Sequence, residues 1–215
     1  MDIIFGHPDL WGQALGGTLL LFFASGAIAL VLGLIVAAAR VSPVPIARAV
    51  GAVYVNWIRN TPLTLVLFFF AFGVPLLFPG RADFTTLAII GIGIYTATYV
   101  AETIRAGVNT VPVGQAEAAR AIGLSFGQVM SLIVLPQATR SVVPPMMSVL
   151  IALLKNTTVA AGFSVMNLGS IRNNMSELGE NQLLTLVWVM VVFVILVLLL
   201  GQLQRYLERR WRIAR

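Results

Sequence analysis

The chain contains no cysteine, a single lysine, and few charged residues of any kind: 10% of its 215 residues. The absence of cysteine excludes disulfide bonds as a source of stability. Soluble domains typically carry about 25% charged residues, whereas here 59% of the residues are hydrophobic and the mean hydropathy is +0.93. This composition indicates an integral membrane protein.

The scarcity of lysine also bears on nucleotide binding. A P-loop needs the pattern Gly-x-x-x-x-Gly-Lys-Ser/Thr, because its backbone amides and its lysine hold the phosphates. The one lysine, Lys155, follows Leu154 and precedes Asn156, so this pattern is absent. The chain is therefore predicted to be non-catalytic, with no catalytic residue, metal or cofactor of its own. If ATP drives its activity, ATP and magnesium belong to a partner subunit.

Five apolar runs are long enough to cross a bilayer, which takes about 20 residues of helix. We predict an all-α polytopic protein that forms one transmembrane domain over residues 1–215. Its expected spans are residues 14–39, 50–78, 85–106, 141–163 and 183–201. Polar residues interrupt the second run at Arg59-Asn60-Thr61-Pro62 and the fourth at Lys155-Asn156-Thr157-Thr158. In the third, Gly91 and Gly93 lack the third glycine of a dinucleotide fingerprint and are expected to permit close helix packing.

Five spans place the two termini on opposite sides of the membrane. If the C-terminus is inside, most arginines fall in cytoplasmic segments, namely Arg40, Arg48, Arg105, Arg120, Arg140 and five in the tail. The outer segments then hold only Arg81 and Arg172, with most of the acidic residues. Because cytoplasmic loops carry an excess of Lys and Arg, we predict an outside N-terminus and an inside C-terminus.

The loop over residues 110–136 is the longest polar interruption of the chain. Gly123 is a typical helix stop, because glycine tolerates the left-handed conformation after a helix. Ser125 followed by Gln128 predicts a capping box that opens a second, short helix. Pro136 is expected to end that helix and to begin the next. A helix, a sharp turn and a second helix between two spans indicate a docking element.

The same loop resembles the EAA loop of ABC-importer permeases. The pattern Glu-Ala-Ala, three residues, Gly, nine residues, Ile, one residue, Leu-Pro is matched without departure, at Glu117, Ala118, Ala119, Gly123, Ile133, Leu135 and Pro136. In that family the loop supplies a coupling helix that fits a groove on the ATPase subunit. The resemblance therefore implies that Glu117, Ala118, Ala119, Gly123 and Leu124 contribute to ATPase coupling.

Further motifs between residues 40 and 165 resemble the polar amino acid permease subfamily, most of all actinobacterial glutamate permease subunits. They include Arg59-Asn60-Thr61-Pro62-Leu63, Ala101-Glu102-Thr103-Ile104-Arg105 and Lys155-Asn156-Thr157-Thr158. The resemblance implies a type I importer permease in a bacterial cell membrane that imports a polar amino acid, with glutamate or another acidic amino acid expected. It also implies a second permease, identical or sister, an ATPase dimer and an extracytoplasmic solute-binding protein. Many relatives have an acid where this chain has Asn156, and its loss suits an anionic substrate.

Ionisable residues inside spans are costly and are functional candidates by default. One interpretation is a substrate path in which Arg59 and Lys155 meet an anionic substrate. The other is structural, with Glu102 paired to one of these cations and the polar residues satisfying broken helix ends. The candidate path residues are Arg59, Asn60, Thr61, Glu102, Lys155, Asn156 and Thr157.

Two other classes of function compete with an ATP-driven importer. A secondary transporter driven by an ion gradient would need inverted repeats and intramembrane carboxylates. The chain shows no repeat, and Glu102 is its one such carboxylate. A membrane scaffold without transport would leave Arg59 and Lys155 without a purpose. Nucleic-acid binding by the basic tail is not expected, because that tail suits the anionic lipids of the inner leaflet.

Overall fold

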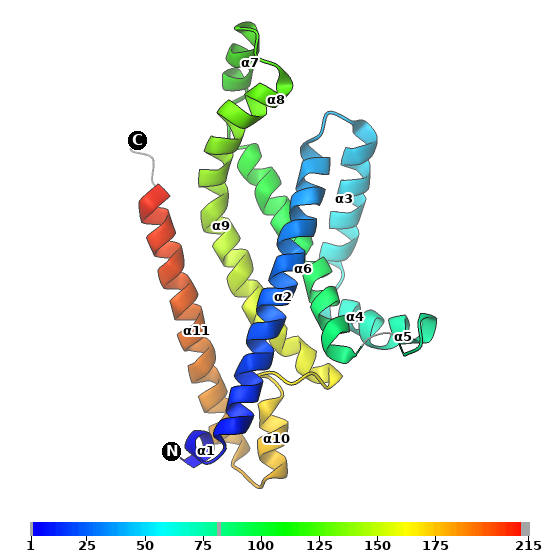
Figure 1. Ribbon diagram of the computed structural model, residues 1–215, viewed down its shortest axis with the longest axis vertical. Helices are drawn as coiled ribbons and strands as arrows, with labels where there is room; N and C mark the ends of the chain where they lie inside the picture. Colours follow the sequence, from blue (N-terminus) through cyan, green and yellow to red (C-terminus); the bar gives the residue numbers. More distant parts are fainter. Residues whose placement is uncertain (1, 81–82, 212–215) are drawn as a thin grey trace.

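The computed structural model describes residues 2–80 and 83–211, and among these residues it contains helices and no strand. Long helices run along an elongated bundle whose two termini lie at opposite ends (Figure 1). They are α2 (Pro8–Val41), α6 (Phe84–Val108), α9 (Leu135–Asn156) and α11 (Gln182–Trp211). The short α1 (Asp2–Phe5) precedes them at the N-terminal end. Opposite termini agree with the predicted odd number of spans. Arg81, one of the two arginines predicted to lie on the outer side, is outside the described residues.

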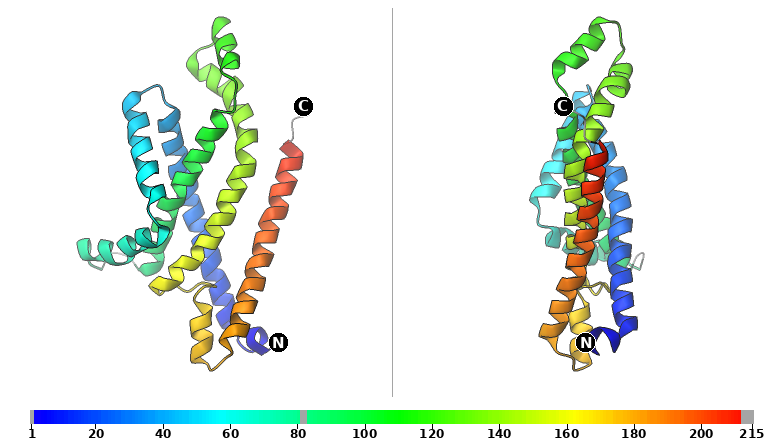
Figure 2. Two further views of the ribbon diagram at one scale, coloured as in Figure 1. Left: turned by 180° about the vertical axis from the view of Figure 1, so that it is seen from behind. Right: turned by 90° about the vertical axis from the view of Figure 1, so that its left-hand side faces the viewer.

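The second predicted span is broken. α3 (Pro45–Asn60) is followed by α4 (Leu63–Phe68), a π-helical turn η1 (Phe69–Gly73) and α5 (Val74–Leu77), and the chain bends by 99° between α3 and α4. Pro62 causes the bend, since a residue before proline avoids the helical region, and Thr61 is extended at φ −88° and ψ 133°. Four described helices are therefore long and apolar enough to cross a membrane, or five with this bent pair. Figure 2 shows α4 and α5 leaving the bundle sideways.

The predicted turn within residues 110–136 is confirmed. α7 (Val113–Ala121) ends in a Schellman motif, in which the Leu124 amide donates to the Ala119 carbonyl at 3.2 Å and Gly123 to Arg120 at 2.9 Å. Gly123 has φ +89°, the left-handed conformation that favours glycine. Ser125 and Gln128 then form the predicted capping box, with both of its hydrogen bonds present.

Pro136 lies in the first turn of α9, as predicted, but the prediction that it ends a separate short helix is wrong. α8 (Phe126–Gln128), a π-helical stretch η2 (Val129–Val134), α9 and a 3₁₀ stretch η3 (Thr157–Phe163) follow one another over residues 126–163 as one candidate span. The wide turn of η2 absorbs the proline, and the Leu135 amide donates to Met130, five residues back. The docking element is thus continuous with the fourth span.

Glycines bring α2 and α6 into close contact. A Cβ at Gly33 would lie 2.5 Å from Cγ1 of Val100, and one at Gly93 would lie 2.8 Å from Cβ of Ile28. Such contacts let two helix backbones approach, as is common between membrane helices. The Ser25 hydroxyl adds a hydrogen bond to the Ile89 carbonyl at 3.0 Å. The expectation that Gly93 serves close packing is therefore confirmed.

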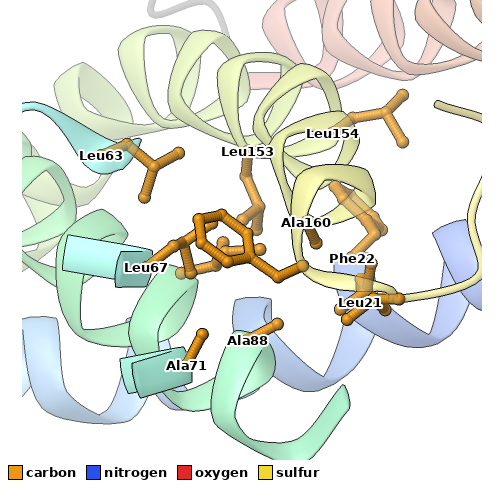
Figure 3. Packing of buried hydrophobic residues seen from close by; sticks show 12 residues of the cluster. Leu21, Phe22, Leu63, Leu67, Ala71, Ala88, Leu153, Leu154 and Ala160 are labelled. Carbon is orange, nitrogen blue, oxygen red and sulfur yellow. The ribbon is translucent and has the colours of Figure 1, made fainter. Parts of the chain in front are cut away.

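The main hydrophobic core lies where α2, α4, α6 and the end of α9 meet (Figure 3). Leu21, Leu67 and Leu153 are almost fully buried in it. Phe68 of α4 packs edge-on against Phe163 of η3, with ring centroids 5.1 Å apart. This core holds the broken second span against the bundle. By contrast, the most apolar window of α11 is only 6% buried, so this helix packs loosely on the rest of the chain.

A hydrogen-bonded loop closes the N-terminal end of the bundle. It connects η3 to α10 (Ile171–Glu177) and packs against α2. The Leu168 amide donates to the Thr18 hydroxyl oxygen at 2.9 Å, and that hydroxyl donates to the Ala14 carbonyl at 3.0 Å. Next to it, a Cβ at Gly17 would lie only 2.0 Å from the Met166 carbonyl oxygen. The loop is therefore seated directly on the backbone of α2.

We predict that Gly17→Ala destabilises the protein by about 1–3 kcal/mol, because the added methyl group meets backbone that cannot rotate away. The neighbouring Gly16→Ala is the matched control, since a Cβ at Gly16 meets nothing within 4 Å. Thermal unfolding of the purified protein in detergent measures both. Equal thermal midpoints for the two variants would contradict this account of the loop.

Candidate functional site

A cleft of about 400 Å³, whose mostly apolar lining includes several polar side chains, lies between α6 and α9. Its lining residues are Tyr95, Thr96 and Tyr99 of α6, with Ser148, Val149, Ala152, Leu153 and Asn156 of α9. Tyr99 lies about one turn after Tyr95 and Thr96 on α6, and Ser148, Ala152 and Asn156 recur every fourth residue on the facing helix. Most residues around these positions are apolar, so the hydroxyls and the amide stand out in the membrane-spanning part of the chain.

The cleft offers hydrogen-bonding groups but no charge. The Tyr95 and Tyr99 hydroxyls lie 2.9 Å apart, so one donates to the other and at least one lone pair remains available. The Thr96 side chain is only 3% exposed, yet its hydroxyl has no hydrogen-bond partner among the described residues. A buried polar group without a partner is unusual and requires an explanation.

Two adjacent residues predicted to line one path face different spaces. Asn156 lines the cleft, whereas Lys155 lines a separate crevice between the end of α9 and α11. The reason is the 100° turn per residue of an α-helix, which points neighbouring side chains in different directions. Lys155 therefore lies behind the helix that forms one wall of the cleft.

The side chain of Thr157 points into the core, so the expectation that it lines a path is not met in this structure. It is fully buried, and its hydroxyl donates to the Leu154 carbonyl at 2.7 Å. Its own carbonyl accepts from the Asn167 side chain at 3.3 Å. These bonds satisfy the end of α9 where it tightens into η3.

Glu102 forms ion pairs, but with other partners than those the sequence suggested. Its carboxylate accepts from Arg40 at 2.5 Å and from Arg105, one turn along α6. Arg59 adds a weaker electrostatic attraction, and Lys155 makes no ion pair with Glu102. The stem of Arg40 packs against Gly51 of α3, where a Cβ would lie 2.8 Å from Cγ of Arg40. This arginine therefore ties α2, α3 and α6 together.

The residues at the break between α3 and α4 line neither of these spaces. Arg59 and Asn60 are exposed, and the Thr61 hydroxyl donates to the Trp57 carbonyl at 2.9 Å. Within the described residues, Arg59 forms no ion pair and donates no hydrogen bond. The break thus presents a cation and an amide on the surface of the single chain.

The tip formed by α7 and α8 projects beyond the other helices at the end opposite the N-terminus (Figure 1). Glu117, Ala118 and Gly123 are exposed there, Leu124 is half-buried, and Ala119 is buried against Val129 and Val134. The tip also exposes large apolar side chains, with Val113 at 71% and Ile122 at 80%. Apolar groups left in water on a structured turn are typical of a docking surface.

The loop tip is joined to the fourth span by a tight contact at its base. The Thr110 hydroxyl lies 3.0 Å from that of Ser141, which donates to the Ala138 carbonyl at 2.8 Å. A Cβ at Gly107 would lie 2.2 Å from Cγ2 of Val142. The ends of α6 and α9 are therefore held together immediately before the chain enters the tip.

Sequence reasoning missed Tyr95, Thr96, Tyr99 and Ser148. A signal was present, because three hydroxyl residues occur on one face of an otherwise apolar stretch of α6. The spacing of Ser148 and Asn156 by two helical turns was a second signal. Neither signal showed that the two faces oppose each other, since that depends on how α6 and α9 pack.

Comparison with known proteins gives consistent matches along the chain. Residues 29–213 match the family described as binding-protein-dependent transport system inner membrane component. The glutamate transport system permease protein of Corynebacterium glutamicum is 43% identical over 78% of this chain and 77% of its own length. The arginine transport system permease protein of Bacillus subtilis is 31% identical over 92% of this chain and 90% of its own.

Among solved structures, the crystal structure of an amino acid ABC transporter with histidines superposes with a TM-score of 0.90. It is 26% identical in sequence, and the match covers 96% of both chains. The similarity therefore includes the broken second span, the tip and α11, and not only the segment of highest sequence identity.

We predict that the same substitution at two buried threonines changes the stability of the protein to different extents. Thr18→Val removes the acceptor of the Leu168 amide and should cost about 1–3 kcal/mol, because a buried donor is left unsatisfied. Thr96→Val removes a hydroxyl that no protein group uses, so stability should stay within about 0.5 kcal/mol. Thermal unfolding in detergent checks both. A large loss at Thr96 would show that its hydroxyl is already satisfied within the protein.

Proposed function

The chain belongs to the family of binding-protein-dependent transport system inner membrane components, and we propose that it is the permease subunit of an ATP-driven amino acid importer. The single observation that carries this proposal is the uncharged cleft between α6 and α9, whose lining includes the polar side chains of Tyr95, Tyr99 and Asn156. The cleft lies beside a helix that continues into the exposed tip. One helix thus contacts both the proposed substrate and the proposed partner.

We propose that the cleft is the substrate station of the transport path. An amino acid carries a carboxylate and an ammonium group, and each needs hydrogen-bonding partners inside a membrane. The hydroxyls of Tyr95, Tyr99 and Ser148 and the amide of Asn156 supply donors and acceptors of both kinds. Within the same proposal, Arg59, Asn60 and Thr61 lie at the mouth of the path, where the broken second span exposes them.

We further propose an acidic amino acid, glutamate above all, as the substrate. The lining of the cleft includes no carboxylate that would repel an anionic side chain. Asn156 is decisive, because an aspartate at this position would place a negative charge against the substrate. The glutamate permease relative from Corynebacterium glutamicum supports the same choice.

An ion-gradient transporter is the competing proposal, and the environment of Glu102 speaks against it. A coupling carboxylate must exchange its ion during transport. Glu102 is instead held by Arg40 and Arg105, and it is the one carboxylate within the predicted spans. A carboxylate neutralised by two permanent cations is poorly suited to binding a proton or a sodium ion.

Coupling to an ATPase dimer is proposed for the tip. Glu117, Ala118 and Gly123 are exposed, Ala119 and Leu124 anchor the turn, and Ile122 presents an apolar side chain to water. This pattern fits a helix that inserts into a groove of a cytoplasmic partner, with an apolar centre and polar edges. The same proposal includes an extracytoplasmic solute-binding protein at the opposite end, near α1 and α10, and a second permease beside this one.

We predict that Glu117→Arg abolishes ATP-driven amino acid uptake while the chain still inserts into the membrane. The reversed charge should weaken docking of the ATPase, which is measured by its retention on the tagged permease through a salt wash. Glu177→Arg, an equally exposed change at the opposite end of the molecule, is the matched control and should retain the ATPase. Full retention of the ATPase by the Glu117→Arg variant, together with normal uptake, would contradict the coupling proposal.

Substrate choice can be tested at one side chain of the cleft. Asn156→Asp keeps the size of the side chain but adds a negative charge, so glutamate uptake should fall by at least about tenfold relative to glutamine uptake, or about 1.4 kcal/mol. Uptake of both amino acids is measured in the same vesicles. An unchanged ratio would place Asn156 outside the substrate's reach.

A further inference from the structure

We propose that His7 and Glu180 form a proton-dependent latch. When the imidazole is charged, this ion pair fastens the start of α2 to the turn between α10 and α11. Only the effect of the latch on transport rests on the proposed function, to which it adds regulation by the acidity of the medium at the N-terminal end of the molecule.

The two side chains of the latch come from opposite ends of the sequence and meet at the N-terminal end of the bundle. Nε2 of His7 lies 3.3 Å from Oε1 of Glu180, and the side chains are 29% and 31% exposed. His7 is the N-cap residue of α2, but its side chain makes no capping hydrogen bond. Glu180 follows α10, next to Gly179 with its left-handed φ of +78°. Figure 1 shows α1, the start of α2 and the start of α11 together at this end.

The parts that the latch joins are already held in place by other contacts. The Trp11 indole donates to the Ile3 carbonyl at 3.0 Å, which holds α1 on α2. Ile3 and Trp11 are buried in one cluster with Ile171 and Met175 of α10. The Glu180 amide donates to the Met175 carbonyl at 3.0 Å, which fixes the turn after α10. The two side chains of the latch therefore meet without the need to order further backbone.

The charge of His7 determines the strength of this contact. A neutral imidazole has one N–H and one bare nitrogen, so one of its tautomers turns a lone pair toward the carboxylate. In the imidazolium both nitrogens donate, and a charge-assisted hydrogen bond is roughly twice as strong as a neutral one. An imidazole changes charge between about pH 5 and 8, whereas a glutamate is charged above about pH 5. The latch is therefore stronger at about pH 5.5 than at about pH 8.

Other ionisable groups at this end do not titrate in the same range. The charged residues on α1, the first turn of α2 and α10 are Asp2, Asp9, Arg172 and Glu177. Arg172 donates to the side-chain oxygens of Asn173 and Gln182. The sequence of α11 has no ionisable residue before Arg205. Carboxylates and guanidinium groups keep their charge between about pH 5.5 and 8. The α-amino group of the chain, which titrates near pH 8, is the same in every variant compared below.

The latch forms in an arrangement whose N-terminal end is closed. α10 follows directly from the loop that is seated on α2, where the Leu168 amide donates to the Thr18 hydroxyl oxygen. A solute that enters from this side needs an opening there, and α10 then moves relative to α2. A proton that binds more tightly to the closed arrangement shifts the equilibrium toward it. Acid on this side, the predicted outer side, should therefore slow uptake.

A double-mutant cycle measures the latch in the full chain, purified in detergent with a tag that contains no histidine. His7 is the one histidine of the sequence, so no other imidazole titrates. At about pH 5.5, His7→Gln and Glu180→Gln should each lower the thermal midpoint by about 1–4 °C, and the double variant should lose no more than either. At about pH 8 the four proteins should agree within about 1 °C. Glu177→Gln removes an exposed carboxylate from α10 and is the matched control, with no change expected at either pH.

Three results of the cycle would overturn the latch. They are the absence of any loss in the acid medium, losses that add in the double variant, and losses that persist in the alkaline medium. A loss of the same size in the Glu177→Gln control would also overturn it, because the effect would then not depend on contact with His7.

The effect on transport is measured on the assembled complex in sealed vesicles, as ATP-driven uptake at an outer pH of about 5.5 and about 8. Between these conditions, uptake by the unaltered complex should fall about two- to threefold more than uptake by the Glu180→Gln complex. An equal fall in both overturns the regulatory role. If neither complex takes up an amino acid, the importer assignment fails, and the double-mutant cycle still decides whether the latch forms.

Discussion

The close approach of α2 and α6 is the interaction on which the rest of the structure depends. Gly33 and Gly93 let the two helices touch, and Glu102 then bridges Arg40 of α2 and Arg105 of α6. The membrane interior has no water to solvate a charge or to hydrogen-bond the ends of a broken helix. The protein itself must therefore supply the arginines that neutralise the Glu102 carboxylate. Arg40 also packs on α3, and α4, the second half of the broken span, contributes Leu63 and Leu67 to the main hydrophobic core. The result is a scaffold of α2, α3, α4 and α6 that forms a fixed wall of the cleft between α6 and α9.

The opposite wall of the cleft belongs to α9, which is built to bend. Pro144 and Pro145 lie inside this helix and remove the amides that would bond the carbonyls of Arg140 and Ser141. The contact of Gly107 with Val142 lies on the side of the tip, and the cleft residues from Ser148 onward lie on the other side. Pro144 and Pro145 lie between these two parts of α9, so a displacement of the tip would bend α9 at the prolines and move the wall of the cleft. This arrangement suits alternating access, in which a partner's motion opens and closes the path.

The sequence predicted the fold class, the apolar spans and the turn at the tip, because these depend on local chemistry. Gly123, Ser125 and Gln128 determine their own backbone geometry. Pro136 begins α9 as predicted, but it does not end a separate helix, because a π-helical turn precedes it and such turns have no simple sequence signature. The substrate path itself stays a prediction, and the structure shows only where its candidate residues lie. Asn156 faces the cleft, but Lys155 and Thr157 point elsewhere, and Glu102 pairs with two arginines. Which of several adjacent polar residues faces a cavity depends on helix rotation and packing, and local patterns do not specify either.

The central claim is that this chain conducts an amino acid by coupling to ATP hydrolysis on a partner. The most direct test is uptake of labelled glutamate by the purified complex in sealed vesicles, with the solute-binding protein on one side and ATP on the other. We predict uptake that requires ATP and its hydrolysis, and that proceeds without any proton or sodium gradient. Uptake that follows an imposed ion gradient and ignores ATP would contradict it.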